Sequence, residues 1–368
     1  MALNRIRLGD YIERSTVNNS DLRYGTDLIV GVNNEGVFTQ PKGDPTNVNL
    51  KPYKIVNNGA FVYNPTRFDL GSIAYRTEGL CIVSHLYMIF YLTDEGKKII
   101  DPMYLYIYLR RKEFQREITF RNFGSQRPEF NFNDISDIEM PLPDISIQRK
   151  YVDVYKAMVA NQKSYEKGLD DLKIVCDAYI EELRRNNPCE EIRPYIAELN
   201  DRNTELSISN VQGVNSSSSF GDTKADTDGL DFHNYKVVRQ GQFAYNPSRI
   251  NLGSIALLRD EDCIISPMYI VFEVTDKKKL LPEYLMMWYG RKEFQRSTLF
   301  YATGSVRDTF GFDVMQEVKI PIPDIDIQRD IAEIYEVYTI RKLINEKLKN
   351  QIKDICPILI KGSIEEAS

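Results

Sequence analysis

The chain has 368 residues, of which 42% are hydrophobic and 27% are charged, and its formal net charge is −6. This composition is typical of a folded protein and excludes wholesale disorder, and the length suggests about two domains. No apolar stretch is long enough to cross a membrane, so no spanning helix is expected. The first residues lack the apolar segment of a signal peptide, and we therefore expect a cytoplasmic protein.

Residue types that carry catalysis or bind metals are sparse. The five cysteines lie far apart and form no Cys-x-x-Cys pair, which argues against a zinc site and against a disulfide framework. The only histidines are His85 and His233, which argues against a catalytic histidine base and against a histidine-rich metal site. Scattered Asp and Glu residues form no convincing nuclease pattern with Lys. We therefore predict no catalytic residue and no metal ligand.

Two large parts of the chain resemble each other. Residues 53–94 return as residues 235–276, and residues 111–149 return as residues 291–329, with about half of the aligned positions identical in each comparison. Internal similarity of this kind indicates a tandem duplication, here of a unit of roughly 180 residues.

Each copy has the same internal order. Short β-branched and aromatic runs, such as residues 60–64 and 81–92, predict strands joined by turns. A helix is expected over 102–118, and again over 282–298, with a proline in its first turn. A short strand at 138–143 then precedes a long polar segment. Strands and helices mixed in one copy indicate an α+β module.

The long segments carry the clearest periodicity. Apolar side chains recur every three or four residues over 151–183, with Gln162 as a polar member, and Pro188 closes the pattern. A second seam covers 331–355, and Pro357 is expected to lie beyond its helix. A helix of about 40 residues is roughly 60 Å long, too long to lie on a small domain. We predict an antiparallel pair of helices packed on each other; the alternative is that each stripe packs on its own module.

Several motifs together carry a family resemblance. Tyr-Asn-Pro-(Thr/Ser)-Arg leads to Gly-Ser-Ile-Ala, a Gly-Ser-x-Arg segment follows, and a Pro-x-Pro…Gln junction opens each long helix. Over nearly its whole length the chain resembles the specificity (S) subunit of type I restriction–modification systems. The most family-specific piece is the junction, formed by Pro141, Pro143 and Gln148 and repeated as Pro321, Pro323 and Gln328.

The resemblance adds domain identities to the α+β fold. It implies two tandem-duplicated α/β target-recognition domains separated by two long helices in an antiparallel coiled coil, with pseudo-twofold symmetry. The expected boundaries are recognition domain 1 at 1–145, spacer helix 1 at 146–187, recognition domain 2 at 188–325, and spacer helix 2 with a C-terminal tail at 326–368.

The same resemblance implies a function without catalysis. Each recognition domain would read one half of a bipartite sequence in double-stranded DNA, and the helices would set the spacer between the halves. Two methylase (M) subunits would bind the chain and carry S-adenosylmethionine, and restriction (R) subunits can join; the chain itself would bind no cofactor. Methylation at N6 of adenine requires that the base be flipped out of the duplex.

Comparison of the two copies separates the candidate DNA-binding residues into two groups. Residues shared by both copies suit phosphate contacts, which carry no sequence information; a plain surface, ion-pair or turn role is the alternative. These residues are Arg67, Arg249, Ser125, Arg127, Ser305 and Arg307. Residues that differ between the copies suit base contacts. They are Arg121, Asn122, Gln126, Tyr301 and Thr303.

Two further regions leave alternatives open. The basic runs 111–116 and 291–296 either face DNA or form a solvated surface, while Phe114 and Phe294 within them are expected to anchor the helix. The acidic balance of the chain predicts weak DNA binding outside an assembly.

Two other functions compete with the DNA specificity subunit. The first is a duplicated coiled-coil scaffold that binds proteins rather than DNA. The second is a specificity subunit that serves a single-chain restriction–methylase enzyme.

Overall fold

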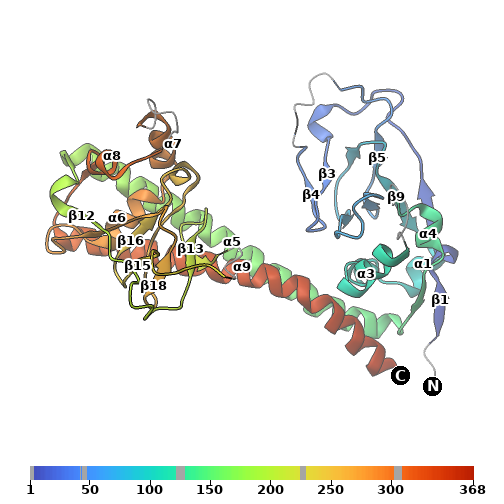
Figure 1. Ribbon diagram of the computed structural model, residues 1–368. Coiled ribbons are helices and arrows are strands. Elements are labelled where there is room, and N and C mark those ends of the chain that lie inside the picture. Colours follow the sequence, from blue (N-terminus) through green and yellow to red (C-terminus); the bar gives the residue numbers. More distant parts are fainter. Residues whose placement is uncertain (1–3, 42, 44–47, 122–128, 224–228, 302–308) are drawn as a thin grey trace. The chain divides into compact units, whose positions relative to one another are not determined.

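The structure is a computed structural model that forms two compact units. It describes residues 4–41, 43, 48–121, 129–223, 229–301 and 309–368. Unit 1 comprises Met1–Tyr165 and Ile344–Ser368, and unit 2 comprises Glu166–Leu343. Each unit therefore contains one α+β module and one half of each long helix (Figure 1).

The two modules contain nearly the same elements in the same order. The elements that begin in unit 1 are β1 (Arg5–Arg7), β2 (Ile12–Ser15), β3 (Gly31–Val32), β4 (Phe38–Thr39), β5 (Lys54–Val56), β6 (Phe61–Tyr63), β7 (Ile73–Tyr75), β8 (Cys81–Val83), β9 (Met88–Leu92), α1 (Asp94–Ile99), α2 (Pro102–Leu109), α3 (Lys112–Arg121), α4 (Phe132–Ser136), β10 (Glu139–Pro141) and α5 (Ile145–Asn186). Those that begin in unit 2 are β11 (Cys189–Glu191), β12 (Ile196–Leu199), β13 (Gln212–Val214), β14 (Phe220–Asp222), β15 (Lys236–Val238), β16 (Phe243–Tyr245), β17 (Ile255–Leu257), β18 (Cys263–Ile265), β19 (Ile270–Val274), α6 (Pro282–Tyr289), α7 (Lys292–Tyr301), α8 (Phe312–Gln316), β20 (Lys319–Pro321) and α9 (Ile325–Ala367).

A four-stranded antiparallel sheet lies at the centre of each module. Its strand order is β2-β9-β6-β7 in unit 1 and β12-β19-β16-β17 in unit 2. Successive side chains of a strand point to opposite faces, and both faces of this sheet are buried. Phe61 and Tyr63 pack into the core that includes α2, whereas Val62 packs into a second core with β5 and β8.

The prediction of one continuous helix over 102–118 is wrong. The structure has two helices there, and α2 ends before Arg110, whose N–H donates to the carbonyl oxygens of Tyr106 and Ile107. The same break separates α6 from α7 in unit 2. The physical reason is burial: α2 is buried on nearly all sides, whereas α3 has exposed charged residues, so the chain turns between them.

The predicted antiparallel packing of the long helices is confirmed. In unit 1, Lys150 of α5 pairs with Glu366 of α9 at 2.8 Å, and Gln162 contacts Asn345, so residue numbers rise along one helix as they fall along the other. Both helices also contribute apolar residues to the core of each module. The apolar stripes therefore pack on the partner helix and on the modules at the same time.

The expectation that Pro357 lies beyond the second long helix is wrong. The helix α9 continues through Pro357 to Ala367. A proline inside a helix removes one backbone hydrogen bond, and here the surrounding turns are held by packing. Cys356, Leu359 and Ile360 are all buried in the core of unit 1.

A buried glutamine joins each module to the start of its long helix. Gln148 is fully buried; its Oε1 accepts from the N–H of Asp101 (2.9 Å), and its Nε2 donates to the carbonyl oxygens of Ile99 (2.8 Å) and Pro143 (2.7 Å). Gln328 makes the corresponding three hydrogen bonds in unit 2, to Leu281, Lys279 and Pro323. One carboxamide thus connects the chain before α2 or α6, the end of the Pro-x-Pro segment and the long helix.

We expect Gln148→Leu to lower the free energy of unfolding of unit 1 by about 2–4 kcal/mol, because one buried N–H and two carbonyl oxygens lose their partner. Urea denaturation of the full chain, with hydrogen exchange to identify the unit that opens, measures this loss. The matched control is Gln351→Leu, an exposed position of α9. Equal stability of the two variants would contradict the role given to Gln148.

Candidate nucleic-acid interface

Arg67 and Arg249 lie on a tight turn that both modules share. In unit 1 the carboxamide oxygen of Asn64 accepts from the N–H of Thr66 at 3.0 Å, and the N–H of Arg67 donates to the Asn64 carbonyl at 3.1 Å. The N–H of Ser72 then donates to the carbonyl of Arg67 at 3.1 Å, which closes the turn. Asn side chains commonly stabilise turns in this way, and Asn246, Ser248 and Arg249 repeat the arrangement in unit 2.

The turn presents its arginine side chains to solvent. Arg67 and Arg249 are exposed, and within the part of the chain that the structure describes neither guanidinium has a hydrogen-bond or ion-pair partner. Sequence reasoning missed two neighbours, which lie three positions after these arginines. Leu70 is 55% exposed in the first copy, and Leu252 is 59% exposed in the second. The duplication therefore retains an exposed arginine and an exposed leucine on the same turn of each module, as expected of a contact that both modules make.

Most of the other candidate residues lie outside the described residues. These are Asn122, Ser125, Gln126, Arg127, Thr303, Ser305 and Arg307. The helices α3 and α7 end at Arg121 and Tyr301, directly before these segments. Directly after them, the N–H of Phe130 donates to the carbonyl oxygen of Pro65 at 3.0 Å, and Phe310 does the same with Pro247. In each module the chain after the undescribed segment is therefore hydrogen-bonded to the arginine turn.

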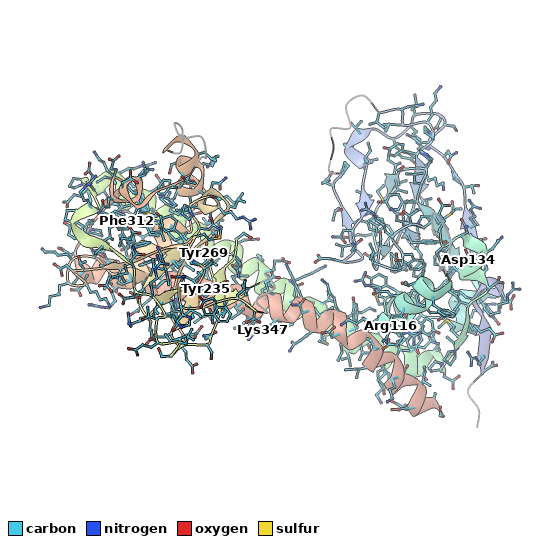
Figure 2. The ribbon with its side chains drawn as sticks, viewed as in Figure 1. Arg116, Asp134, Tyr235, Tyr269, Phe312 and Lys347 are labelled. Atoms are coloured by element: carbon cyan, nitrogen blue, oxygen red, sulfur yellow. The ribbon has the colours of Figure 1, made fainter. Side chains whose placement is uncertain are left out.

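The basic runs serve in part to attach the modules to the long helices. Lys112 of α3 pairs with Asp354 of α9 at 2.6 Å, and both belong to unit 1. Arg116, labelled in Figure 2, pairs with Glu113 of the same helix at 3.6 Å. As predicted, Phe114 is buried. Several of these cations are thus engaged within the protein rather than free for phosphate.

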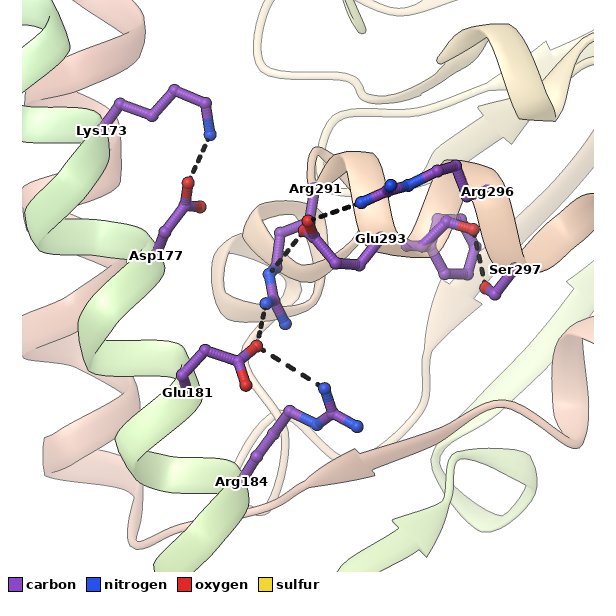
Figure 3. Close-up of polar contacts among 9 residues, drawn as sticks. Lys173, Asp177, Glu181, Arg184, Arg291, Glu293, Arg296 and Ser297 are labelled. Carbon is purple, nitrogen blue, oxygen red and sulfur yellow. Dashed lines mark hydrogen bonds and ion pairs between the residues drawn. The ribbon is translucent and has the colours of Figure 1, made fainter.

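Unit 2 has a more buried version of this attachment. The guanidinium of Arg291 is almost fully buried and donates a hydrogen bond to Glu181 of α5 (Figure 3). It also lies 3.6 Å from Glu293 and 5.0 Å from the ring centroid of Trp288. The hydrogen bond from Arg291 holds the pKa of Glu181 below its ordinary value.

The corresponding position in unit 1, Arg111, forms no such ion pair with any residue that the structure describes. Arg111 lies over the ring of Tyr108 at 3.7 Å and donates to the Tyr108 carbonyl. The residue of α9 that corresponds to Glu181 is Lys361, which pairs with Glu365 at 3.6 Å. The two modules are therefore attached to the helices by different polar contacts around the same frame.

The described residues contain no cluster of side chains suited to a metal ion. Among residues 4–41, 43, 48–121, 129–223, 229–301 and 309–368, no group of three or more His, Cys, Asp or Glu side chains is placed to hold a metal ion. Burial raises the pKa of Cys263 to about 12 and that of Cys356 to about 11, and both thiols pack in cores. No helix in the described part is long and apolar enough to cross a membrane.

Comparison with known proteins identifies a family and a fold. The family described as type I restriction modification DNA specificity domain matches residues 9–171 and 215–354. No curated protein matches the chain. Among solved structures, the S subunit of a type I restriction–modification system from M. genitalium superimposes with a TM-score of 0.64 at 10% identity, over 99% of this chain and 96% of that one. The HsdS subunit from Thermoanaerobacter tengcongensis has a TM-score of 0.39 at 15% identity, over 99% and 96%.

We expect Arg67→Ala to weaken DNA binding by the assembled complex about tenfold at every site and to reduce the salt dependence of binding by about one phosphate contact. Fluorescence anisotropy at several salt concentrations, with target and unrelated duplexes, measures both quantities. Arg185→Ala, which removes an exposed arginine of α5, is the control. A changed sequence preference would show that Arg67 contacts a base instead of a phosphate.

A second prediction concerns the buried ion pair. Glu181→Gln should lower the free energy of unfolding of unit 2 by about 1–2 kcal/mol at pH 7, since Glu181 is partly exposed and Arg291 keeps Glu293. Because its folded-state pKa is depressed, the Glu181 carboxylate stabilises the fold above the ordinary value of 4.5 and loses this effect as pH falls through the lower folded pKa.

Denaturation at pH 7 and below pH 4 measures this difference, which should shrink at the acidic pH. The control is Glu182→Gln, which changes an exposed glutamate next to it in the sequence. A loss of stability that is the same at both pH values would contradict the assignment to the charged pair.

Proposed function

The chain belongs to the family of type I restriction–modification DNA specificity domains, and from this premise we propose that it reads a bipartite sequence in double-stranded DNA for a modification complex. The observation that carries the proposal is the duplication itself. The two modules have the same strand order in their central sheets. Each is joined by the same buried glutamine to the start of one long helix, and the two helices form one antiparallel pair. One chain thereby contains two recognition modules of the same kind.

The two modules would read different half-sites. Positions that build the frame are retained in both copies: the Asn-stabilised turn with Arg67 and Arg249, the buried glutamines and the central sheets. The positions just after Arg121 and Tyr301 differ between the copies. Phosphate contacts position a protein on DNA, whereas base contacts select the sequence. Two modules that read different half-sites need the same frame to contact the phosphates and different segments to contact the bases.

The chain would act without catalysis of its own. In the proposed complex, methylation at N6 of adenine is carried out by methylase (M) subunits, which also bind S-adenosylmethionine, and restriction (R) subunits can join them in the cytoplasm. The duplication offers two equivalent surfaces for two methylase subunits. Leu70 and Leu252, exposed at the same place in each module, suit such a repeated protein contact.

The acidic charge balance fits work inside an assembly. Asp and Glu residues outnumber Lys and Arg by 53 to 47, while proteins that bind DNA alone usually rely on a basic surface. Several basic side chains, among them Lys112 and Arg291, are already paired with acidic residues of the helices. Much of the phosphate neutralisation would therefore come from the partner subunits.

We expect long-read sequencing of cells that carry this gene with its neighbouring methylase to show one bipartite motif methylated on adenine. An in-frame deletion of the gene should abolish methylation of that motif, because the methylase then has no specificity subunit. Replacing residues 1–145 with those of another family member should change only one half of the motif. An active methylase whose motif is unaffected by the deletion would favour the protein-binding scaffold instead.

A further inference from the structure

The seam between the two long helices contains a buried pair of amides. The Nε2 of Gln162 on α5 donates to the Oδ1 of Asn345 on α9 at 3.0 Å. Gln162 is 8% exposed and Asn345 is 3% exposed, so both carboxamides lie inside the helix pair. Nearby seam positions are apolar, such as Leu169, which is also 8% exposed. A polar pair in such a place weakens packing but specifies how helices align.

The helix α9 has a second apolar stripe that competes with the first. Val337, Ile340 and Leu343 are 45%, 52% and 57% exposed. At about 100° per residue, Ile340 and Leu343 lie on the side of α9 roughly opposite Asn345, whereas Val337 lies roughly a quarter turn away from it. Ile331 and Leu359 hold α9 in the two module cores. Between those cores hydrophobic burial is not directional, so the amide pair is the contact that distinguishes the two sides of the helix.

We propose that Gln162 and Asn345 are positioning residues that fix the rotation of α9 against α5 and thereby the spacer length of the bipartite DNA target. The inference rests on the proposed function, in which the helices set the distance between the half-sites. If α9 turned its second stripe inward, both amides would lose their partner in a buried place. An unsatisfied buried polar group is costly, whereas a leucine in the same place is not. The pair therefore selects one arrangement.

The pair is present once in the duplicated chain, which makes it specific to the contact between α5 and α9. The residues at the corresponding positions of the other copy are Lys342 for Gln162 and Tyr165 for Asn345. Lys342 is exposed and Tyr165 is half-buried. Two copies of the first helix paired with each other would set Gln162 against Tyr165 and lose the matched amides.

The consequence for DNA is a matter of small distances and angles. One additional base pair moves a half-site by about 3.4 Å along the duplex and turns it by roughly 35°. A modest change in how α9 sits against α5 is therefore comparable with a change of one base pair in the spacer. Fixing the rotation of the helix confines the complex to one spacer length.

The test is the double variant Gln162→Leu with Asn345→Leu, expressed with the methylase and analysed by long-read methylation mapping. We expect both half-sites to stay the same while at least a tenth of the methylated sites carry a spacer one base pair longer or shorter. The control is Gln351→Leu, which adds a leucine at an exposed position of α9 and leaves the amides intact, and it should keep the single spacer. A single spacer in the double variant would overturn the proposal.

A second measurement is made on the purified full chain. Spin labels are attached at the exposed positions Val154 and Ile358, and Cys189→Ser removes the exposed thiol. The distance between the two labels reports how α5 and α9 lie against each other within unit 1. We expect one narrow distance distribution with the amides and a broadened or doubled one in the double leucine variant. An unchanged narrow distribution would also overturn the proposal. Failure of the proposed function would give a different result from failure of this inference, because the wild type would then show no bipartite motif at all.

Discussion

The carboxamides of Gln148 and Gln328 form the constraint on which the rest of the structure depends. Each satisfies one N–H and two carbonyl oxygens where a module meets its long helix. In unit 1 these groups belong to the end of α1, the N-cap of α2 and the Pro-x-Pro segment. A buried backbone group without a partner is costly, so the glutamine fixes where the helix begins relative to α2 or α6. The Pro-x-Pro segment before it restricts the backbone further. Module and spacer helix are thereby joined with little freedom.

The attachment of each module to the helices differs in a way that has energetic consequences. In unit 2, the Arg291 guanidinium is desolvated and surrounded by Glu181, Glu293 and the Trp288 ring. In unit 1, the Lys112–Asp354 pair is more than half exposed, and exposed pairs contribute little and are screened by salt. Unit 1 therefore relies on its apolar core, to which α9 contributes Leu359 and Ile360.

The sequence supported the repeat, the strand-rich modules and the helix pair because these depend on local periodicity. It could not reveal contacts between distant positions: the partners of Gln148 lie up to 49 residues away, and Lys112 meets Asp354 across 242 residues. Local rules failed where tertiary packing prevailed, at the break before Arg110 and at Pro357. At the site, the free arginines were predictable as a shared motif, whereas the exposed Leu70 and Leu252 carried no periodic signal.

The helix α9 belongs to both units, so a substitution along its buried side affects more than one part of the structure. It contributes Ile331 to the core of unit 2 and Leu359 to that of unit 1, so a substitution along its buried stripe affects a core or the amide pair. Effects of distant, independent sites usually add, so one module can acquire a new half-site while the other and the spacer stay as they are. Independent cores on a shared pair of helices allow two half-sites to vary separately.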